Sequence, residues 1–505
     1  MNDGRIHRLV IAGGGTAGWI AACALSHQFH GLIDIALVES EEIGTIGVGE
    51  STIPPIRAFH RLMQIDEREF MRETAAAFKL GISFEGWRRP DEHYFHPFGI
   101  TGQPTWAAPF HHFWLESRAR GMDSALGEYC LESRAAGEKR FALGGQPEAN
   151  YAYHLDAGIY ARFLRRISER RGVRRIEGRI SEVRQHPESG FVESLVLESG
   201  EVVEGDLFVD CTGFRGLLIE QTLRTGYEDW NQWLPCDRAV AVQTQLTGPA
   251  VPYTRAIAHE SGWRWCIPLQ HRAGNGRVYA SAHLSDDEAT ACLLQEVDGA
   301  PIVEPRVIRF RTGRRRQVWN RNVVALGLSS GFVEPLESTS IHLIVTGVVR
   351  LIQMFPDGGI SQELVDRYND EARSELEHVR DFIILHYHAN QRDEPMWRAC
   401  REMAVPDSLA RRITLFRDRA HVWLAEDELF RLDSWIHVML GQGIEPRRHH
   451  PVTRAISDAD LRRLLDSVRG GLAPAVAAMP PHQQFLQQYC AAGSDVWERA
   501  RRPAR

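Results

Sequence analysis

Lysine is almost missing from this chain. Of its 59 basic residues only Lys79 and Lys139 are lysines, and all the others are arginines. A lysine amine can lose its proton, whereas an arginine guanidinium stays charged. A lysine retained in such a chain therefore indicates a role that needs a neutral amine, although chance alone can also leave two lysines in place.

Paired cysteines, long apolar runs and a secretory signal are also absent. The eight cysteines are scattered without any Cys-x-x-Cys pair, which favours reduced thiols and argues against a zinc site. No apolar run approaches the roughly 20 residues of a membrane-spanning helix, and the start of the chain is polar. Histidine pairs such as His111 and His112 lack the spacing of a metalloprotease site. We therefore expect no metal, no membrane partner and a cytoplasmic location.

The charge balance points away from nucleic acid as a partner. The formal net charge is −7 at pH 7, which gives no general attraction for a polyanion. Hydrophobic residues make up 43% and charged residues 25%, as is typical of a globular protein. A chain of 505 residues can bury a large core and hold two structural regions. A small molecule is the expected partner, and the composition is also compatible with a homodimer.

Apolar segments near the start of the chain alternate between strand and helix. Residues 5–12 and 33–38 are predicted to be buried strands, and residues 16–29 a helix between them. Residues 195–203, 207–211 and 323–326 are expected to be later strands of the same sheet. The predicted fold class is therefore α/β with a Rossmann-like sheet.

Three glycines follow the first strand and open the first helix. Gly13, Gly15 and Gly18 have the Gly-x-Gly-x-x-Gly spacing of a dinucleotide-binding turn. Such a turn brings a pyrophosphate to the helix N-terminus, where backbone N–H groups and the helix dipole favour negative charge. Glu39 ends the second strand, where a carboxylate accepts hydrogen bonds from the adenosine ribose. A purely structural tight turn is the weaker alternative.

Two further glycine-bounded loops favour FAD over NAD. Residues 47–54 and 205–213 lie beside strands, where glycines let the backbone approach a flat ring closely. Ordinary strand-to-helix turns are the alternative. Because the sequence shows no second nucleotide-binding fingerprint for NADH, we expect a separate flavin reductase to supply reduced FAD.

Three motifs together resemble the flavin-dependent tryptophan halogenase family. They are Gly13-Gly14-Gly15-Thr16-Ala17-Gly18-Trp19, the Gly-Glu-Ser-Thr-Ile-Pro stretch at 49–54, and Trp263-Arg264-Trp265-Cys266-Ile267-Pro268. The last motif matches Trp-x-Trp-x-Ile-Pro, which distinguishes halogenases from related flavin monooxygenases. The resemblance continues through residues 332–339 to Trp435, so it covers nearly the whole chain.

The resemblance implies that reduced FAD, oxygen and chloride or bromide are combined into hypohalous acid. The residues that match the family's FAD contacts are Gly13, Gly15, Thr16, Ala17, Gly18, Glu39, Gly49, Ser51, Val183, Leu328 and Ile341. The backbone N–H groups of Thr339 and Ser340 match the halide site, and Ser340 replaces the family's usual glycine. Because a side chain now stands at the halide pocket, the choice between chloride and bromide stays open.

By the same resemblance Lys79 and Glu337 are the catalytic residues. Lys79 would carry or polarise the hypohalous acid, as a haloamine or as a hydrogen-bond donor, which gives the scarcity of lysine a reason. Glu337 would orient the halogenating species and accept the proton lost from the ring. Trp263 and Trp265 would keep the substrate away from the flavin, with core packing as the alternative. For Lys79 the alternative is a surface lysine paired with Glu73.

The substrate is expected to be a flat aromatic. The residues that match the family's aromatic clamp are His96, Phe98 and Trp435. Where enzymes for free tryptophan hold its amino and carboxylate groups, this chain offers Trp423, Leu424 and Phe430. Leucine and phenylalanine cannot pair with an ammonium group, and an unpaired charge is costly to bury. We therefore expect an indole without the amino-acid handle, or another electron-rich aromatic.

Apolar periodicity becomes helical after residue 341. The predicted helices cover residues 341–354, 361–390 and 408–417. We expect an FAD-binding module over residues 1–350, with inserted aromatic-rich segments at about 90–150 and 230–301, and a helical substrate-binding module over 351–505.

Two other functions stay open at this point. One is a flavin-dependent monooxygenase that hydroxylates an aromatic ring, which would not need Trp263, Trp265 and Lys79. The other is a flavin-binding redox sensor without turnover, which would not need Lys79 together with Glu337.

Overall fold

The computed structural model describes residues 5–42, 49–103, 105–122 and 124–493. A mainly parallel sheet of order β20-β21-β12-β1-β2-β8 contains the first strand of the described residues. Strand β1 pairs in parallel with both β2 and β12, and β12 pairs in parallel with β21. The strands are β1 (Arg8–Ala12), β2 (Asp34–Glu39), β8 (Arg174–Glu177), β12 (Leu207–Asp210), β20 (Trp319–Asn320) and β21 (Val323–Ala325). The α/β class and the first strand–helix–strand unit are confirmed.

Helix α1 (Thr16–Gln28) is buried over most of its length, from Gly18 to Ser26. Its small residues, among them Ala21, Ala22 and Ala24, let it lie close to its neighbours in the core. Those neighbours are the sheet and the helices α6 (Ala157–Arg170) and α8 (Ser340–Gln353). The N-terminus of α1 is therefore held in a fixed position at the carboxyl end of β1.

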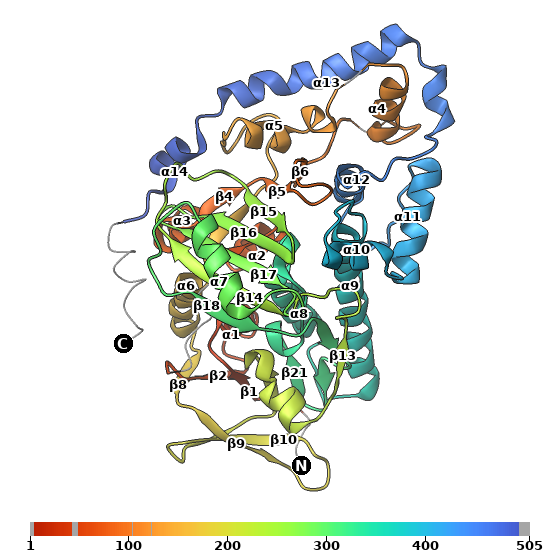
Figure 1. Cartoon of the computed structure of the whole chain (residues 1–505). Coiled ribbons are helices and arrows are strands. Elements are labelled where there is room, and N and C mark those ends of the chain that lie inside the picture. The colour runs from red at the N-terminus through yellow and green to blue at the C-terminus, as the bar shows by residue number, and fades with distance from the viewer. Residues whose placement is uncertain (1–4, 43–48, 104, 123, 494–505) are drawn as a thin grey trace.

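The prediction that residues 195–203 form one strand of the main sheet is wrong. The chain turns at Ser199 and Gly200, where Gly200 has a φ of +87° and its N–H bonds to the carbonyl of Leu197 at 2.9 Å. The segment instead contributes to a separate antiparallel sheet of order β11-β10-β9, which extends from one end of the molecule (Figure 1). Its strands are β9 (Ile180–Gln185), β10 (Val192–Leu197) and β11 (Val202–Glu204).

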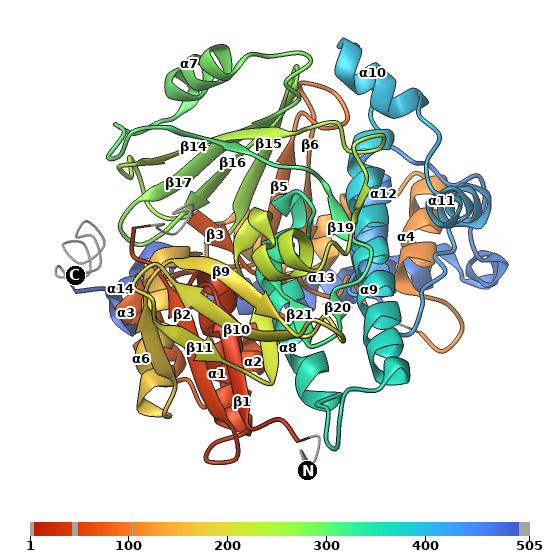
Figure 2. The same ribbon diagram turned by 90° about the horizontal axis from the view of Figure 1, so that it is seen from below.

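Both aromatic-rich inserts contribute strands to one large sheet. Its order is β18-β14-β17-β16-β15-β5-β6, and β5 and β15 are parallel neighbours. Figure 2 shows β14 to β17 in the opposite half of the molecule from β1 and β2. The strands are β5 (Gly81–Glu85), β6 (His93–Pro97), β14 (Arg238–Thr244), β15 (Thr254–His259), β16 (Gly262–Pro268), β17 (Ala273–Tyr279) and β18 (Arg306–Arg309).

A small sheet of order β3-β7-β4 places two sequence motifs side by side. Strands β3 (Gly49–Ser51) and β4 (Ala77–Lys79) both pair with β7 (Ala152–Asp156), so Ser51 and Ala77 each face His154. Lys79 lies opposite Ala152 at the end of β4. This pairing explains how the Gly-Glu-Ser-Thr-Ile-Pro motif and Lys79 come together.

The C-terminal part of the described chain is helical, as predicted. Helix α9 runs along one side of the molecule past both large sheets (Figure 2), and α13 lies across α4 and α5 (Figure 1). Helix α12 packs on β6. The helices are α4 (Phe110–Ala119), α5 (Leu131–Gly137), α9 (Gln362–His388), α10 (Pro395–Glu402), α11 (Asp407–Arg419), α12 (Leu432–Gly441), α13 (Asp458–Ala478) and α14 (His482–Cys490).

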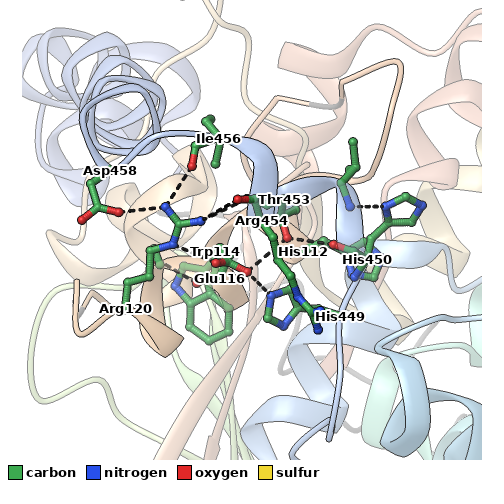
Figure 3. A network of polar contacts seen from close by, with 12 residues as sticks. His112, Trp114, Glu116, Arg120, His449, His450, Thr453, Arg454, Ile456 and Asp458 are labelled. Atoms are coloured by element: carbon green, nitrogen blue, oxygen red, sulfur yellow. Dashed lines mark hydrogen bonds and ion pairs between the residues drawn. The ribbon is translucent and has the colours of Figure 1, made fainter.

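A partly buried polar network ties the C-terminal helices to the first aromatic-rich insert (Figure 3). The carboxylate of Glu116 on α4 accepts a hydrogen bond from Arg120 at 2.7 Å and lies 2.5 Å from Nε2 of His449. Arg120 also donates to Asp458 at the start of α13 and to the carbonyl of Ile456. Because the buried carboxylate of Glu116 has partners from both segments, the network helps to fix how they pack.

Two features are absent from the described residue ranges, namely a membrane-spanning helix and a cluster of metal ligands. No helix there is long and apolar enough to cross a membrane. No group of three histidine, cysteine, aspartate or glutamate side chains there is arranged to hold a metal ion. All eight cysteines are unpaired.

Candidate active site

A cavity of about 1320 Å³ lies between the Rossmann-like sheet and the seven-stranded sheet. Pockets for small molecules commonly enclose about 300–1,000 Å³, so this one has room for a large ligand. The predicted cofactor residues on its wall are Gly13, Gly15, Thr16, Ala17, Glu39, Gly49, Ser51, Leu328 and Ile341. These residues come from five separate parts of the chain.

The glycine turn fits a pyrophosphate. Gly13 has a φ of +108°, and a Cβ there would stand 2.3 Å from the carbonyl oxygen of Cys211. A Cβ at Gly18 would stand 1.9 Å from the carbonyl oxygen of Gly13. A Cβ at Gly15 would meet no atom within 4 Å, because Gly15 faces the cavity at the N-cap of α1. The turn therefore leaves a ligand-sized space at a helix N-terminus, which suits the negative charge of FAD.

Two of the predicted cofactor residues lie off the cavity wall. Gly18 packs against Gly13 from behind, so it supports the turn. Val183 lies on β9 and packs on the apolar cluster between β9–β11 and the main sheet. From the same segment Arg179 and Ile180 line the cavity instead. A direct cofactor contact by Val183 is therefore not supported by its position.

Glu39 lies at the cavity wall with its carboxylate already engaged. Nε of Arg175 donates to it at 2.6 Å, Arg165 lies 3.6 Å away, and Nε1 of Trp19 donates at 3.4 Å. The arginines orient this carboxylate at the cavity wall, where its oxygens can accept hydrogen bonds from a ribose.

Lys79 is fully buried, so the alternative of a surface lysine is wrong. Glu73, its proposed surface partner, pairs with Arg166 instead. Nζ of Lys79 donates to the carbonyl of Thr52 at 3.1 Å and to Oγ of Ser338 at 2.8 Å. Burial lowers the pKa of Lys79 to about 7, against the opposing effect of the nearby Glu337 charge.

The two hydrogen bonds of Lys79 determine whether a lone pair or an N–H group of its amine remains available. A neutral amine has two N–H groups, which Thr52 and Ser338 take up, so its lone pair remains for chemistry. A charged amine keeps a third N–H that can polarise an oxygen. Nζ lies 4.8 Å from the centre of the Phe98 ring, and Ser338 lines the large cavity. Lys79 therefore stands behind the cavity wall, next to a predicted substrate residue.

Glu337 is a buried carboxylate held between two histidines. Nδ1 of His96 lies 2.9 and 3.0 Å from its two oxygens. Nε2 of His386 lies 2.8 Å from Oε1. Burial acts to raise the pKa of Glu337, but the two histidines outweigh it and hold the pKa at about 2. Glu337 is therefore ionised throughout the physiological range.

The residues that hold Glu337 and Lys79 were missed in the sequence, apart from His96. Tyr94 lies 2.8 Å from Nδ1 of His386 and so fixes its ring. Thr52 and Ser338 lie in the recognised segments 49–54 and 332–339. Membership in these segments was therefore the sequence signal that could have identified both residues. His386 lies in the long helix α9, where no local pattern marks it.

The predicted halide turn follows Glu337 directly. Ser338 has a φ of +61°, and this left-handed conformation turns the chain into α8. Thr339 is buried at the N-cap, and its Oγ1 has no hydrogen-bond partner among the described residues. Ser340 is the first residue of α8 and lines the cavity. The N–H groups of a helix start are suited to an anion.

Trp263 and Trp265 both line the cavity from strand β16. Trp263 is 1% exposed, and Trp265 lies over Gly276, where a Cβ would come within 2.0 Å of the indole ring. The residues of β16 that line the cavity are Trp263, Trp265 and Ile267, so this strand contributes an apolar section of the wall. Both roles considered for them, packing and shielding, are compatible with this position.

Two of the three predicted clamp residues, His96 and Trp435, belong to one aromatic cluster, whereas the contact of the Phe98 ring is with Nζ of Lys79. Phe382 of α9 lies 5.8 Å from the His96 ring and 4.8 Å from the Trp435 ring, centre to centre. Phe430 stacks on Phe382 at 3.8 Å. Trp423 is 57% exposed and lies outside this cluster. The cluster therefore offers apolar ring faces, and Phe430 contributes no charge to it.

Comparisons with known proteins identify the family of this chain. The family model for tryptophan halogenases matches residues 8–458. Tryptophan 7-halogenase RebH of Lentzea aerocolonigenes is 38% identical over an alignment of 529 residues, which covers 96% of this chain and 99% of RebH. The structure of Xcc4156, a flavin-dependent halogenase from Xanthomonas campestris, has 54% identity and a TM-score of 0.95 and covers 97% of this chain and 99% of its own. BrvH, a flavin-dependent halogenase from Brevundimonas sp. BAL3, has 47% identity and a TM-score of 0.92 and covers 96% of this chain and 99% of its own. The chain therefore belongs to the flavin-dependent tryptophan halogenase family and is a flavin-dependent oxidoreductase.

Proposed function

We propose that this enzyme uses reduced FAD, oxygen and chloride or bromide to halogenate an electron-rich aromatic of the indole type. The observation that carries the proposal is the buried amine of Lys79, which reaches the cavity wall through Ser338 and has a pKa of about 7. Neither an aromatic hydroxylase nor a flavin sensor has a use for such an amine. A separate flavin reductase, meeting the enzyme transiently in the cytoplasm, would supply the reduced FAD.

The chain's own groups account for the steps that need protein. The turn from Gly13 to Ala17, Glu39 and Leu328 would hold FAD, which when bound and reduced supplies hypohalous acid from oxygen and halide. Trp263 and Trp265 keep the substrate from the flavin side of the wall. Residues 1–350 would bind FAD and, through the two inserted segments, part of the substrate. The helices after residue 351 would complete the substrate site, so we propose two modules.

Lys79 receives the halogenating species and presents it to the substrate. As a neutral amine it attacks the halogen through its lone pair, forms an N–halogen bond and releases hydroxide, which takes up the amine proton as water. As a charged amine it would polarise hypohalous acid through its third N–H. In both cases the hydrogen bonds to Thr52 and Ser338 fix the position of Nζ.

Glu337 accepts the proton that the ring loses when halogen replaces hydrogen. A carboxylate with a pKa of about 2 is a weak base, but a protonated arene is a far stronger acid, so the transfer is downhill. His96 and His386 keep the carboxylate ionised and aim its oxygens. For this proton transfer the position of Glu337 therefore matters more than its basicity.

The aromatic cluster supports an indole without a charged handle. Phe382 and Phe430 give the cluster apolar walls, and Arg412 and Glu428 behind Trp435 neutralise one another as a buried pair. Nδ1 of His96 serves Glu337, while its buried Nε2 has no partner among the described residues and can accept a hydrogen bond from a ring N–H. An indole or a similar donor would satisfy that atom.

The proposed function is tested by the products of one assay. The purified enzyme, FAD, a flavin reductase with NADH, and bromide are incubated with indole and with a panel of other indoles and phenols, and products are identified by mass spectrometry. We expect bromoindole that depends on every component. Hydroxylated product without bromine would establish the monooxygenase instead, and no product with reversible flavin reduction would establish the sensor.

Bromide is expected to support more turnover than chloride. Ser340 brings a side chain to the halide turn where the family has glycine, and bromide is less tightly hydrated and easier to oxidise. Equal concentrations of both halides in one reaction give the preference directly, and Ser340→Gly should move it toward chloride. Predominant chlorination by the unmodified enzyme would refute this prediction.

Glu337→Gln is expected to retain residual halogenation. Without the base, product formation should fall by about 10²- to 10⁴-fold, the range of positioned proton-transfer groups. The amide also turns an N–H₂ toward one of the two histidine N–H donors, so a histidine must change tautomer or move. Steady-state rates of bromoindole formation measure the loss, with FAD affinity as the control. Full activity in Glu337→Gln would exclude Glu337 as the base.

A further inference from the structure

Glu334 is a fully buried carboxyl group that none of the steps above uses. Its Oε2 accepts two hydrogen bonds, from Nε1 of Trp263 at 2.8 Å and from the hydroxyl of Tyr387 at 2.6 Å. Its Oε1 is buried and has no partner among the described residues. Oε2 therefore accepts both hydrogen bonds, and one of them comes from Trp263 in the cavity wall.

The surroundings of Glu334 contain no compensating charge. The titratable groups that face it are the hydroxyl of Tyr387 and the thiols of Cys236 and Cys400, and burial raises the pKa of each of these three groups. Within the described residues no arginine, lysine or histidine pairs with it. Burial raises the pKa of Glu334 itself to about 7, against the two hydrogen bonds that favour its charged form.

The position of Glu334 in the chain connects it to both halves of the site. It precedes Glu337 by three residues, in the same tight turn. Helix α9 contacts this turn through two consecutive residues, because His386 lies against Glu337 and Tyr387 against Glu334. From the other side Trp263 of β16 reaches Glu334 and packs at 6.2 Å against the ring of Trp87.

We propose that Glu334 is a positioning residue that holds Trp263 in the wall of the flavin cavity and joins this wall to the turn carrying Glu337. As a neutral carboxyl it accepts both hydrogen bonds at no electrostatic cost. When it loses its proton, an unpaired charge is left in an apolar region, and water or a side-chain movement must compensate it. The wall at Trp263 then opens, and hypohalous acid escapes instead of reaching Lys79.

This inference rests on the proposed halogenation, so its test combines activity with a readout that needs none. The activity readout is halogenated indole formed per oxygen consumed, measured in wild type, Glu334→Gln and Glu334→Leu between pH 6 and pH 9. Glutamine keeps a neutral acceptor for Trp263 and Tyr387, whereas leucine removes it. Lys79 titrates in the same range in all three proteins, so the ratio of each variant to wild type at each pH isolates Glu334.

We expect Glu334→Gln to match wild type at pH 6 and to exceed it by about tenfold at pH 8, because a group with a pKa of about 7 is about 90% ionised there. Glu334→Leu should waste oxygen as hydrogen peroxide at every pH. A ratio between glutamine variant and wild type that stays constant with pH would overturn the proposal. If the leucine variant fails to fold, the glutamine variant alone decides.

The second readout is the infrared difference spectrum of wild type minus Glu334→Gln. At pH 6 it should contain the C=O band of a neutral carboxylic acid, and the band should vanish as the pH rises through about 7. Absence of this band at pH 6 refutes the inference even if halogenation is observed. If no halogenated product forms at all, the proposed function fails while the band still tests Glu334.

Discussion

Lys79→Ala is expected to abolish carbon–halogen bond formation while FAD binding remains intact. The amine lies behind the cavity wall and contributes no atom to it, so its removal leaves the flavin side unchanged. Product should fall by at least about 10²- to 10⁴-fold, the range for loss of one positioned catalytic group. Oxygen consumption with reduced flavin should continue, so the product formed per oxygen consumed is the decisive quantity.

Two further variants separate the chemistry of the amine from its charge. Lys79→Arg keeps a cation but removes the group that can become neutral, so it should fail as well. Lys139→Asn is the matched control, because Lys139 is the other lysine of the chain, lies exposed at a left-handed position that asparagine tolerates, and should behave like wild type. Substantial bromoindole from Lys79→Ala would overturn the mechanism.

The pH dependence of product formation distinguishes the two roles of Lys79. Burial lowers its pKa to about 7, so the neutral amine dominates above that pH and the charged amine below it. A haloamine needs the lone pair and predicts that halogenation in Glu334→Gln rises through pH 7. A hydrogen-bond donor predicts a fall over the same range. Glu337, with a pKa of about 2, does not titrate near pH 7, so it cannot cause either the rise or the fall in halogenation.

The sequence predicted those parts of the site that depend on short local motifs or on single residues. The turn from Gly13 to Gly18 needs glycine for reasons of local geometry, so its place at the start of α1 could be read directly. The scarcity of lysine drew attention to Lys79, and the resemblance to the family distinguished it from Lys139. In both cases the decisive property belongs to the residue itself.

The partners that tune the site could not be read in this way. His386 lies 49 positions after Glu337 and Tyr387 lies 53 positions after Glu334, on a helix whose sequence indicates only that it is helical. Only the packing of α9 against the turn at 335–337 makes these contacts. The lowered pKa of Glu337 and the raised pKa of Glu334, two carboxyls of one turn, thus depend on tertiary structure.

The strand prediction for residues 195–203 failed for a physical reason. These residues have the alternation of a strand, but alternation does not tell which sheet a strand joins. The cofactor contact of Val183 was carried over by resemblance alone and stays a prediction, and its side chain packs in an apolar cluster beside β9, β10 and β11. Pairing between distant strands depends on the whole fold, which a local pattern does not contain.

Gly15→Val is expected to remove FAD binding from a protein that still folds. Gly15 has a φ of −73° and a ψ of −173°, an extended conformation that valine adopts readily, and its Cβ would meet no protein atom within 4 Å. The side chain would therefore project into the cavity, where we propose that the pyrophosphate binds at the N-terminus of α1. Loss of two charge-assisted hydrogen bonds, at about 1.5–3 kcal/mol each, corresponds to an affinity loss of roughly 100-fold or more.

Matched glycine variants show whether this loss comes from the cavity or from the fold. Gly470→Val places the same side chain on helix α13, where a Cβ also meets no atom within 4 Å, and should bind FAD like wild type. Gly18→Ala should instead reduce thermal stability, because its Cβ would stand 1.9 Å from the carbonyl oxygen of Gly13. Titration of FAD by flavin fluorescence, with a thermal melt of each variant, gives both quantities. Unchanged FAD affinity in a folded Gly15→Val would show that the pyrophosphate lies elsewhere, since no valine at the mouth of this turn can share that space with it.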